Sequence, residues 1–224
     1  VKTVNSELIK QIIIQAGGNP LSIGHGDYSS IWLKNPTSIT KVKTALANAN
    51  IPNVAAVYAR TPKGNYALVS PVSHLASPAV AQAQIDLLST LNVAESPDIV
   101  LIYDENTITM TPTFLKVGRK GDHGGATWGA QHIPLIINGP RIKKGLVSRF
   151  PARLVDIAPT LESLLETYPD RQDGIPLADA IRNPPKGSPA EQKKLAPRLT
   201  LDVQALEQEA TLHATATARK QGQG

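Results

Sequence analysis

The sequence predicts an α/β fold in which helices cover a largely parallel β-sheet. Short segments typical of buried strands alternate along the chain with segments of helical periodicity, which is the pattern of α/β layers. Apolar residues make up 41% of the chain but aromatic residues only 4%. The core must therefore consist mainly of Ile, Leu, Val and Ala, which suits a sheet packed between helices.

Three helices are predicted in the first half of the chain. Each starts at a residue that can cap a helix and continues with apolar residues at helical spacing. The predicted helices are residues 6–16 after a Ser6 cap, a helix from Thr37 or Ser38 that ends before Pro52, and residues 77–91 with Ser77 as the cap.

Predicted strands lie between these helices. Residues 21–33 read as extended chain that is interrupted near the Gly-His-Gly sequence at 24–26. Residues 54–58 and 66–69 are rich in β-forming residues, and the turn-like sequence between them predicts a hairpin. Residues 99–103 read as a buried strand.

A glycine-rich loop leads into an apolar run in the second half of the chain. Gly121, Gly124 and Gly125 surround His123, and residues without a Cβ allow positive φ and the close approach of a bulky ligand. Residues 133–137 then read as a continuous apolar strand. The pattern predicts an exposed site loop held by a rigid strand.

The composition changes after Ile181. Residues 183–189 form a Pro-rich linker, and residues 190–219 can form a helix but lack a strong apolar stripe. We expect the last five residues to be disordered. The predicted division is therefore a domain at 1–182 and a linker with a helical or disordered tail at 183–224.

Composition excludes several classes of protein. The absence of Cys excludes disulfides, thiolate metal ligands and cysteine nucleophiles, and it leaves the compartment open. No stretch approaches the ~18 uninterrupted apolar residues of a membrane span. The motifs of a serine nucleophile elbow and of a P-loop are absent. The chain begins with Val-Lys-Thr and has no signal-peptide pattern, so we expect the true N-terminus to lie elsewhere.

Positive charge gathers around the glycine-rich loop. The formal net charge is +5, and the stretch from Lys116 to Arg153 holds eight Lys and Arg residues against Asp122 alone. A basic rim would steer phosphate-bearing substrates towards a site. A solvated basic face without a ligand is the alternative. The basic residues are not interleaved with aromatic ones, so we expect no nucleic-acid partner.

The second half of the chain holds two linked motifs. The first is Gly-Asp-His-Gly-Gly at 121–125 with the apolar run that ends in Gly139-Pro140, and the second is Asp-Ile-Ala-Pro-Thr at 156–160. Together they resemble the type I phosphodiesterase / nucleotide pyrophosphatase family of the alkaline phosphatase superfamily, and the resemblance implies that the second motif starts a helix. The resemblance covers about residues 118–181. It implies an alkaline-phosphatase-like α/β/α sandwich of which this chain is the C-terminal part.

The resemblance also implies a metal site. His123 would be one ligand of a divalent metal, and Zn²⁺ accepts His and carboxylate ligands. In an intact family member, two metals activate a Thr or Ser nucleophile and hold the oxygens of a phosphate mono- or diester. Sulfate and phosphonate esters are related substrates.

The remaining motifs of the family cannot be assigned in this chain. No His has an Asp four residues before it, and the only Asp-His dipeptide is Asp122-His123. We therefore expect the chain to be inactive alone. The upstream N-terminal half of the same domain, or a partner chain, would supply the nucleophile and the other ligands. A non-catalytic fragment or a structural subunit of a larger complex is the alternative.

The candidate side chains also have structural interpretations. A His in a glycine loop can be satisfied by backbone groups, and Asp122 is better explained as a turn residue than as an acceptor that orients an imidazole. We expect His132 at the end of a strand with a bond to the backbone, and Trp128 at the edge of the core.

Two further segments invite a functional interpretation. The acidic sequence at 104–106 follows a predicted strand, where ligands often lie, but an exposed loop is the better interpretation. The Gly-His-Gly-Asp sequence at 24–27 lacks the third glycine and the helix start of a phosphate-binding loop.

Overall fold

The described residues form two compact units. The computed structural model describes residues 2–69, 77–91, 94–111, 124–167 and 172–221. Unit 1 comprises residues 1–133 and 205–224, and unit 2 comprises residues 134–204. The chain thus passes from unit 1 into unit 2 and back again. The domain boundary at 182–183 stays a prediction.

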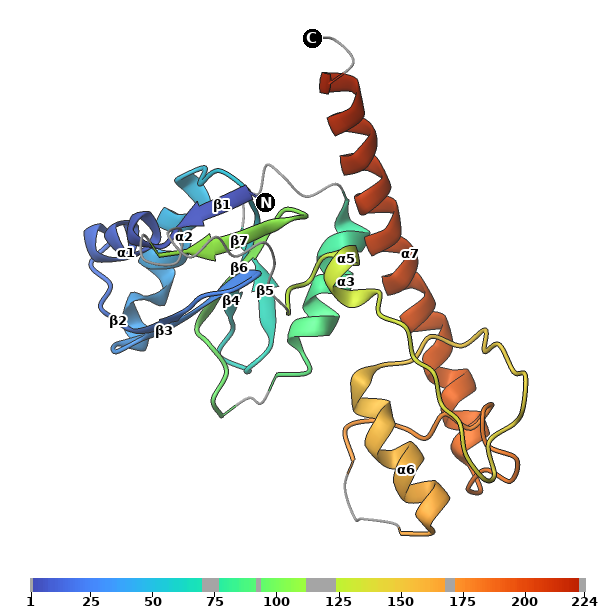
Figure 1. Cartoon of the computed structure of the whole chain (residues 1–224). Coiled ribbons are helices and arrows are strands. Elements are labelled where there is room, and N and C mark those ends of the chain that lie inside the picture. Colours follow the sequence, from blue (N-terminus) through green and yellow to red (C-terminus); the bar gives the residue numbers. More distant parts are fainter. Residues whose placement is uncertain (1, 70–76, 92–93, 112–123, 168–171, 222–224) are drawn as a thin grey trace. The chain divides into compact units, whose positions relative to one another are not determined.

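A five-stranded sheet forms the centre of unit 1 (Figure 1), in the strand order β2-β3-β6-β4-β5. Its strands are β2 (Pro20–Gly24), β3 (Tyr28–Leu33), β6 (Ile99–Tyr103), β4 (Val54–Arg60) and β5 (Tyr66–Leu68). Every neighbouring pair in this sheet is antiparallel. Strands β1 (Lys2–Asn5) and β7 (Thr107–Met110) form a separate parallel pair.

The α/β class is confirmed, but the prediction of a largely parallel sheet is wrong for the described residues. Strands β3 and β4 are linked through the helix α2 (Ile39–Asn48) and run parallel, because both are antiparallel to β6. Strand β6 comes later in the chain and lies between them. The alternation of strands and helices in the sequence predicts the crossover from β3 through α2 to β4. It does not predict that β6 lies between these two strands.

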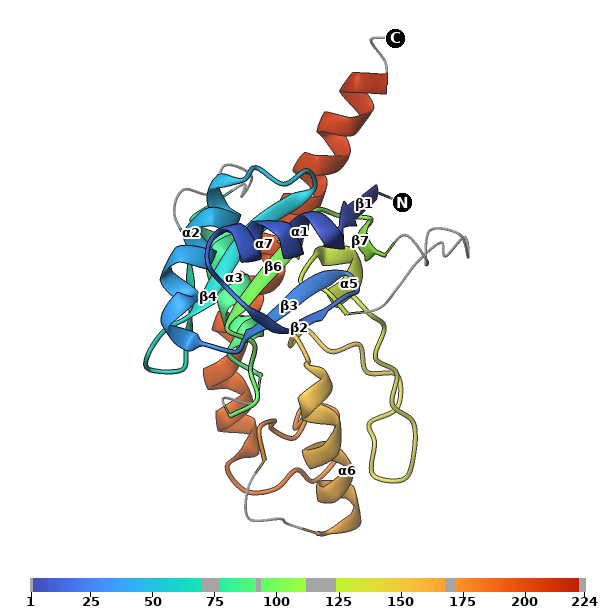
Figure 2. The same cartoon turned by 90° about the vertical axis from the view of Figure 1, so that its left-hand side faces the viewer.

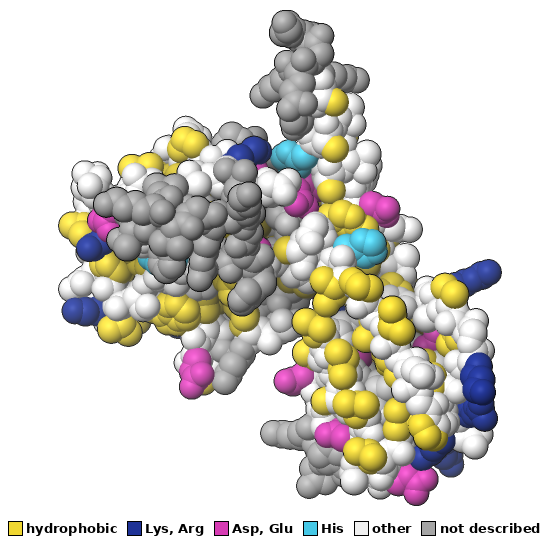
Figure 3. Space-filling view, viewed as in Figure 1, with side chains coloured by type: hydrophobic (Ala, Val, Ile, Leu, Met, Phe, Trp, Pro, Cys, Tyr) yellow, Lys and Arg dark blue, Asp and Glu magenta, His cyan; other side chains and the backbone are white. Residues whose placement is uncertain are grey.

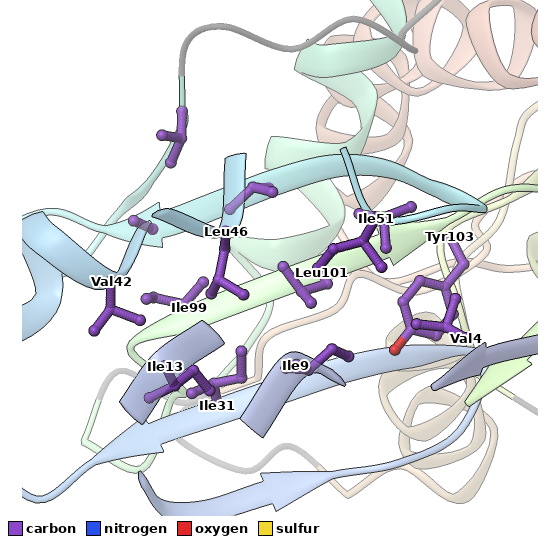
Figure 4. Close-up of a cluster of buried hydrophobic side chains, with 14 of the residues drawn as sticks. Val4, Ile9, Ile13, Ile31, Val42, Leu46, Ile51, Ile99, Leu101 and Tyr103 are labelled. Carbon is purple, nitrogen blue, oxygen red and sulfur yellow. The ribbon is translucent and has the colours of Figure 1, made fainter. Parts of the chain in front are cut away.

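Strand β6 is buried on both faces, and alternate side chains enter different apolar clusters. Ile99, Leu101 and Tyr103 face the helices α1 (Ser6–Gln15) and α2 in the cluster shown in Figure 4. Val100 and Ile102 belong to the second cluster, with Leu88 of the helix α3 (Pro78–Leu88). Figure 2 shows α1 and α2 beside the sheet. Unit 1 is therefore a sheet with helices on both faces.

The helices of unit 1 follow the predicted ranges, with one difference at a cap. Asn5, and not Ser6, caps α1, because its side-chain oxygen accepts a hydrogen bond of 2.9 Å from the backbone N–H of Glu7. Ser77 caps α3 as predicted. A short 3₁₀ turn at Pro36–Ser38 precedes α2, which begins at Ile39. None of the helices among the described residues is both long and apolar enough to cross a membrane.

Asp98 holds the three central strands of the sheet together at one end, directly before β6 begins. Its Oδ2 accepts a hydrogen bond of 2.8 Å from the backbone N–H of Leu33, and its Oδ1 accepts one of 2.8 Å from Arg60. The backbone N–H of Asp98 donates to the carbonyl of Ile31. A buried carboxylate is stable only with such partners, so Asp98 fixes β3 and β4 relative to the start of β6.

Three buried hydroxyl groups contact one another beside β7. The Tyr103 hydroxyl lies 2.5 Å from the Ser29 Oγ and 2.5 Å from the Thr109 Oγ1. Burial raises the pKa of Tyr103 to about 12 from 10.0, and the hydrogen bonds with Ser29 and Thr109 oppose that rise. The group therefore stays neutral and links the large sheet to the parallel strand pair.

We predict that Tyr103→Phe lowers the free energy of unfolding at pH 8 by ~1–3 kcal/mol, because the hydroxyl groups of Ser29 and Thr109 lose a buried partner. The wild-type tyrosine ionises more easily when unfolded, so its contribution falls as the pH rises from 10.0 towards about 12. The difference between the two proteins should therefore shrink at pH 11. Chemical denaturation at both pH values measures it, and an unchanged difference would contradict the burial of this group.

Unit 2 has little regular structure before its helices. A 3₁₀ turn at Leu154–Asp156 leads into α6 (Ile157–Leu165), as the second motif predicts. An isolated antiparallel bridge joins Ile142 to Ile181, and both side chains are buried.

The long helix α7 (Ser188–Gln221) begins in unit 2 and ends in unit 1, and it extends the helix predicted at 190–219. Ala205 and Leu206 are buried against Val80 and Ala83 of α3. The C-terminal half of α7 therefore contributes to the core of unit 1.

The strand predicted at residues 133–137 is absent. This segment has no regular secondary structure, and no described segment pairs with it. Ile133, Leu135 and Ile136 are 52%, 42% and 90% exposed. The prediction failed because an apolar run forms a strand only where a neighbouring strand satisfies its backbone groups.

Gly174 lies so close to another backbone segment that no side chain fits. A Cβ at this position would lie 2.0 Å from the carbonyl oxygen of Val155. We predict that Gly174→Ala destabilises unit 2 by ~1–3 kcal/mol through overpacking. Gly139→Ala is the matched control, because nothing lies within 4 Å of a Cβ there. Hydrogen exchange of the α6 amides should become faster in the first variant only, and equal exchange in both would contradict the close approach.

Candidate functional site

The end of the glycine-rich loop has the backbone conformation that the sequence predicts. Gly124 and Gly125 have φ values of +98° and +85°, a region that favours glycine. The carbonyl oxygen of Gly125 accepts a hydrogen bond from the side-chain amide of Gln131. These residues directly follow His123 in the sequence.

Gly125 packs against Asp27 of the connection between β2 and β3. A Cβ at Gly125 would lie 2.9 Å from the Asp27 Cβ and 3.6 Å from its carbonyl oxygen, so only glycine fits without a shift. The carbonyl of the neighbouring Gly26 accepts a hydrogen bond of 2.8 Å from the backbone N–H of Thr109. The glycine segments at 24–27 and 124–125 lie far apart in the sequence, but the structure brings them together.

Several predicted site residues lie outside the described residues. They are His123, the predicted zinc ligand, its neighbour Asp122, and the basic residues Lys116, Arg119 and Lys120. Their roles therefore stay predictions from the sequence.

His132 lies at the end of a helix, and not at the end of a strand as predicted. The short helix α5 (Trp128–Gln131) follows the glycine loop, and His132 caps its C-terminus. The rings of Trp128 and His132 stack with centroids 4.2 Å apart and planes 16° apart. Trp128 also packs against the apolar cluster of α3 and α7, which agrees with its predicted place at the edge of the core.

Acidic side chains line a small pocket of unit 1. Asp104, Glu105, Glu209 and His213 are among its lining residues, together with Thr127 and five uncharged residues. The Glu105 Oε1 accepts a hydrogen bond of 2.9 Å from the backbone N–H of Gly129, and Glu209 lies 3.9 Å from His213. The acidic segment at 104–106 is therefore partly buried in the structure, not a fully exposed loop.

The charge of this pocket does not suit a phosphate ester. Its three carboxylates would repel the phosphate oxygens, and the described cation near Asp104 is Lys2, whose Nζ lies 3.9 Å from the Oδ2. Tyr58 lies nearby and has a raised pKa, mainly because it is buried and also because of the charge of Glu209. Within the described residues, no group of three or more His, Asp and Glu side chains could hold a metal ion.

Asp156 of the second motif has a structural role in unit 2. Its side chain is buried and accepts hydrogen bonds from the backbone N–H groups of Arg153 and Ile175, at 2.9 and 3.0 Å. The Arg153 guanidinium lies 2.8 Å from the Oδ1. The Thr160 hydroxyl accepts from the backbone of Leu177 and donates to the Asp156 carbonyl. The motif therefore connects the start of α6 to the segment that precedes α7.

Three of the five described basic residues between 140 and 153 contact other parts of unit 2. Arg141 pairs with Glu166 at 3.0 Å, and Arg153 pairs with Asp156. Lys143 donates a hydrogen bond of 2.7 Å to the Asp179 carbonyl. These contacts favour a structural role for this part of the basic cluster.

No protein-family model, no curated protein and no solved structure matches this chain.

We predict that Gly125→Ala disturbs the connection at 24–27. The new methyl group would collide with Asp27, and the alanine would have to keep a left-handed backbone conformation that favours glycine. Gly124→Ala is the matched control, because its backbone conformation is similar but a Cβ would only approach Tyr28 at 3.5 Å. Hydrogen exchange at residues 24–28 should become faster mainly in the first variant. An equal effect in both variants would show that backbone strain alone is responsible.

Proposed function

We propose that this chain is the C-terminal part of a metal-dependent hydrolase of phosphate esters with an alkaline-phosphatase-like α/β/α sandwich. In the proposed complete enzyme, His123 is one ligand of Zn²⁺, and the substrate is a phosphate mono- or diester. An upstream half of the same domain, or a partner chain, supplies the nucleophile and the remaining ligands. The chain alone is inactive.

One structural observation supports the proposal beyond the two sequence motifs. Gly124 and Gly125, directly after His123 in the sequence, hold conformations that favour glycine, and Gly125 packs against Asp27 of the connection between β2 and β3. A loop that is anchored in this way suits a side chain that must be held in one place to bind a metal ion, because pre-organisation of that side chain lowers the entropic cost of binding the metal.

The described residues alone do not fit a zinc site, since no suitable group of three ligands occurs among them. The proposal therefore assigns to this chain only the positioning of one imidazole. No step of the reaction is assigned to its described residues. The acidic pocket near Asp104 is not proposed as the substrate site, because its carboxylates would repel phosphate.

A structural subunit without activity is the second candidate. The observation that favours it is the sequence itself, which lacks the nucleophile motif and the paired ligands of the resembled family. The two candidates differ in one measurable property, because only the first one yields an active, metal-containing assembly when the upstream region is present.

The test compares the isolated chain with the polypeptide that includes the upstream region, using a chromogenic phosphodiester and zinc. We predict no turnover above background for the isolated chain, and turnover with bound zinc for the longer polypeptide. In the longer polypeptide, His123→Ala should lower both zinc content and activity by orders of magnitude.

His132→Ala is the matched control for this variant. Its imidazole stacks on Trp128 at the end of α5, so its removal should leave zinc content and turnover close to the wild-type values. Full zinc occupancy with normal turnover in His123→Ala would contradict the ligand assignment. Absence of turnover and of zinc in the longer polypeptide would favour the structural subunit.

A further inference from the structure

The pair Asn138-Gly139 lies in the irregular segment of unit 2 that leads to the bridge between Ile142 and Ile181. It is the only Asn-Gly pair in the sequence, and both residues are exposed. The amide carbon of an Asn side chain is electrophilic, and the backbone nitrogen of the next residue can reach it. The pair can therefore undergo a reaction within the chain that changes both its charge and its backbone.

The two reacting groups are not held by other contacts. Among the hydrogen bonds of the described residues, none has the Gly139 N–H as its donor and none involves the side chain of Asn138. No described atom lies within 4 Å of the position that a Cβ would take at Gly139, so a ring can form at this point. Glycine also allows the backbone rotation that ring closure needs.

Three other asparagines lack this combination of features. The side-chain oxygens of Asn5 and Asn35 each accept a hydrogen bond from the backbone N–H two residues later, at 2.9 and 3.0 Å. The residue after Asn35 is a proline, which has no N–H. The side-chain amide of Asn53 donates to the carbonyl of Thr3, and the residue that follows is the β-branched Val54. Hydrogen bonding and the next residue therefore both oppose the reaction at these sites.

We propose that Asn138 is a site of spontaneous deamidation. In the first step, hydroxide takes the proton of the Gly139 N–H, and the nitrogen attacks the Asn138 Cγ. The new C–N bond closes a succinimide ring, the bond from Cγ to the side-chain nitrogen breaks, and that nitrogen takes a proton from water and leaves as ammonia. In the second step, water adds to one of the two ring carbonyls and opens the ring. The product at position 138 is aspartate or isoaspartate, depending on which carbonyl reacts.

The modification changes the charge of a basic part of unit 2. It replaces a neutral amide by a carboxylate and so lowers the formal net charge of the chain from +5 by one. Arg141, Lys143 and Lys144 follow closely, and no acidic residue occurs between Asn138 and Asp156. Figure 3 shows Lys and Arg side chains gathered along one side of this unit. The positive potential of this stretch therefore falls as the protein ages.

The contacts that follow the pair should survive the reaction. The backbone N–H of Ile142 donates to the Gly139 carbonyl at 3.3 Å, and that of Lys143 donates to the Ala180 carbonyl at 2.9 Å. An isoaspartate adds one carbon to the backbone before Gly139, on the other side of the pair from these contacts. We therefore expect both products to keep the fold of unit 2.

The experiment incubates the chain at neutral and at mildly alkaline pH and follows the peptide that contains Asn138 by mass spectrometry. We expect conversion to aspartate and isoaspartate that is faster at the higher pH, because the Gly139 nitrogen must lose its proton before it attacks. The rate in the folded chain should lie within about tenfold of the rate in guanidinium chloride, because local structure does not protect the pair. Cation-exchange chromatography should show the loss of one positive charge in step with the conversion.

Gly139→Ala separates the reaction from general instability. The variant should deamidate at least about tenfold more slowly, because a Cβ hinders the rotation that closes the ring. Its melting temperature should stay unchanged, since the added methyl group lies in open space. Asn53 in the same sample is the internal control and should remain unmodified, because its side chain is hydrogen-bonded.

Three results would overturn the proposal. The first is a folded chain in which Asn138 reacts more than about tenfold more slowly than in the unfolded chain, which would show that the structure holds the pair. The second is an equal rate in wild type and Gly139→Ala. The third is modification of Asn53 that is as fast as that of Asn138. None of these measurements involves zinc or phosphate esters, so the proposal stands or falls independently of the proposed function.

Discussion

The burial of β6 on both faces is the constraint on which unit 1 depends. Because its five residues enter two apolar clusters alternately, both α1 with α2 on one side and α3 on the other must cover the sheet. Asp98, immediately before the strand, adds the polar contacts that fix its neighbours β3 and β4. Loss of packing on either face would therefore affect both layers, since the same backbone carries them.

Local patterns predicted most elements of unit 1 and most of α7, because each depends on interactions within a few residues, whereas α6 was expected from the resemblance of its first residues to a known family. Signals of this kind are Ser77 followed by proline, the helical spacing of Val42 and Leu46, and the β-forming residues on both sides of the turn at 61–65. The antiparallel arrangement was not predictable in this way. It depends on where β6 inserts, and that choice is set by contacts between residues far apart in the sequence.

The same distinction applies to the candidate site. Positive φ at Gly124 and Gly125 followed from residue type alone. The contact of Gly125 with Asp27 did not follow in this way, since nearly one hundred residues separate the two loops and neither sequence carries a signal of the other. The strand that the sequence predicts at 133–137 is absent for a different reason. Its residues have the right composition, but composition cannot create the neighbouring strand that its backbone requires.

The path of the chain through the two units has a consequence for synthesis on the ribosome. Val80 and Ala83 of α3 are covered by Ala205 and Leu206, which are translated more than one hundred residues later. At typical translation rates of about 5–20 residues per second, that apolar surface of the nascent chain remains uncovered for several seconds or longer. During this interval the growing polypeptide presents a surface that a chaperone can bind, until Ala205 and Leu206 of α7 cover it.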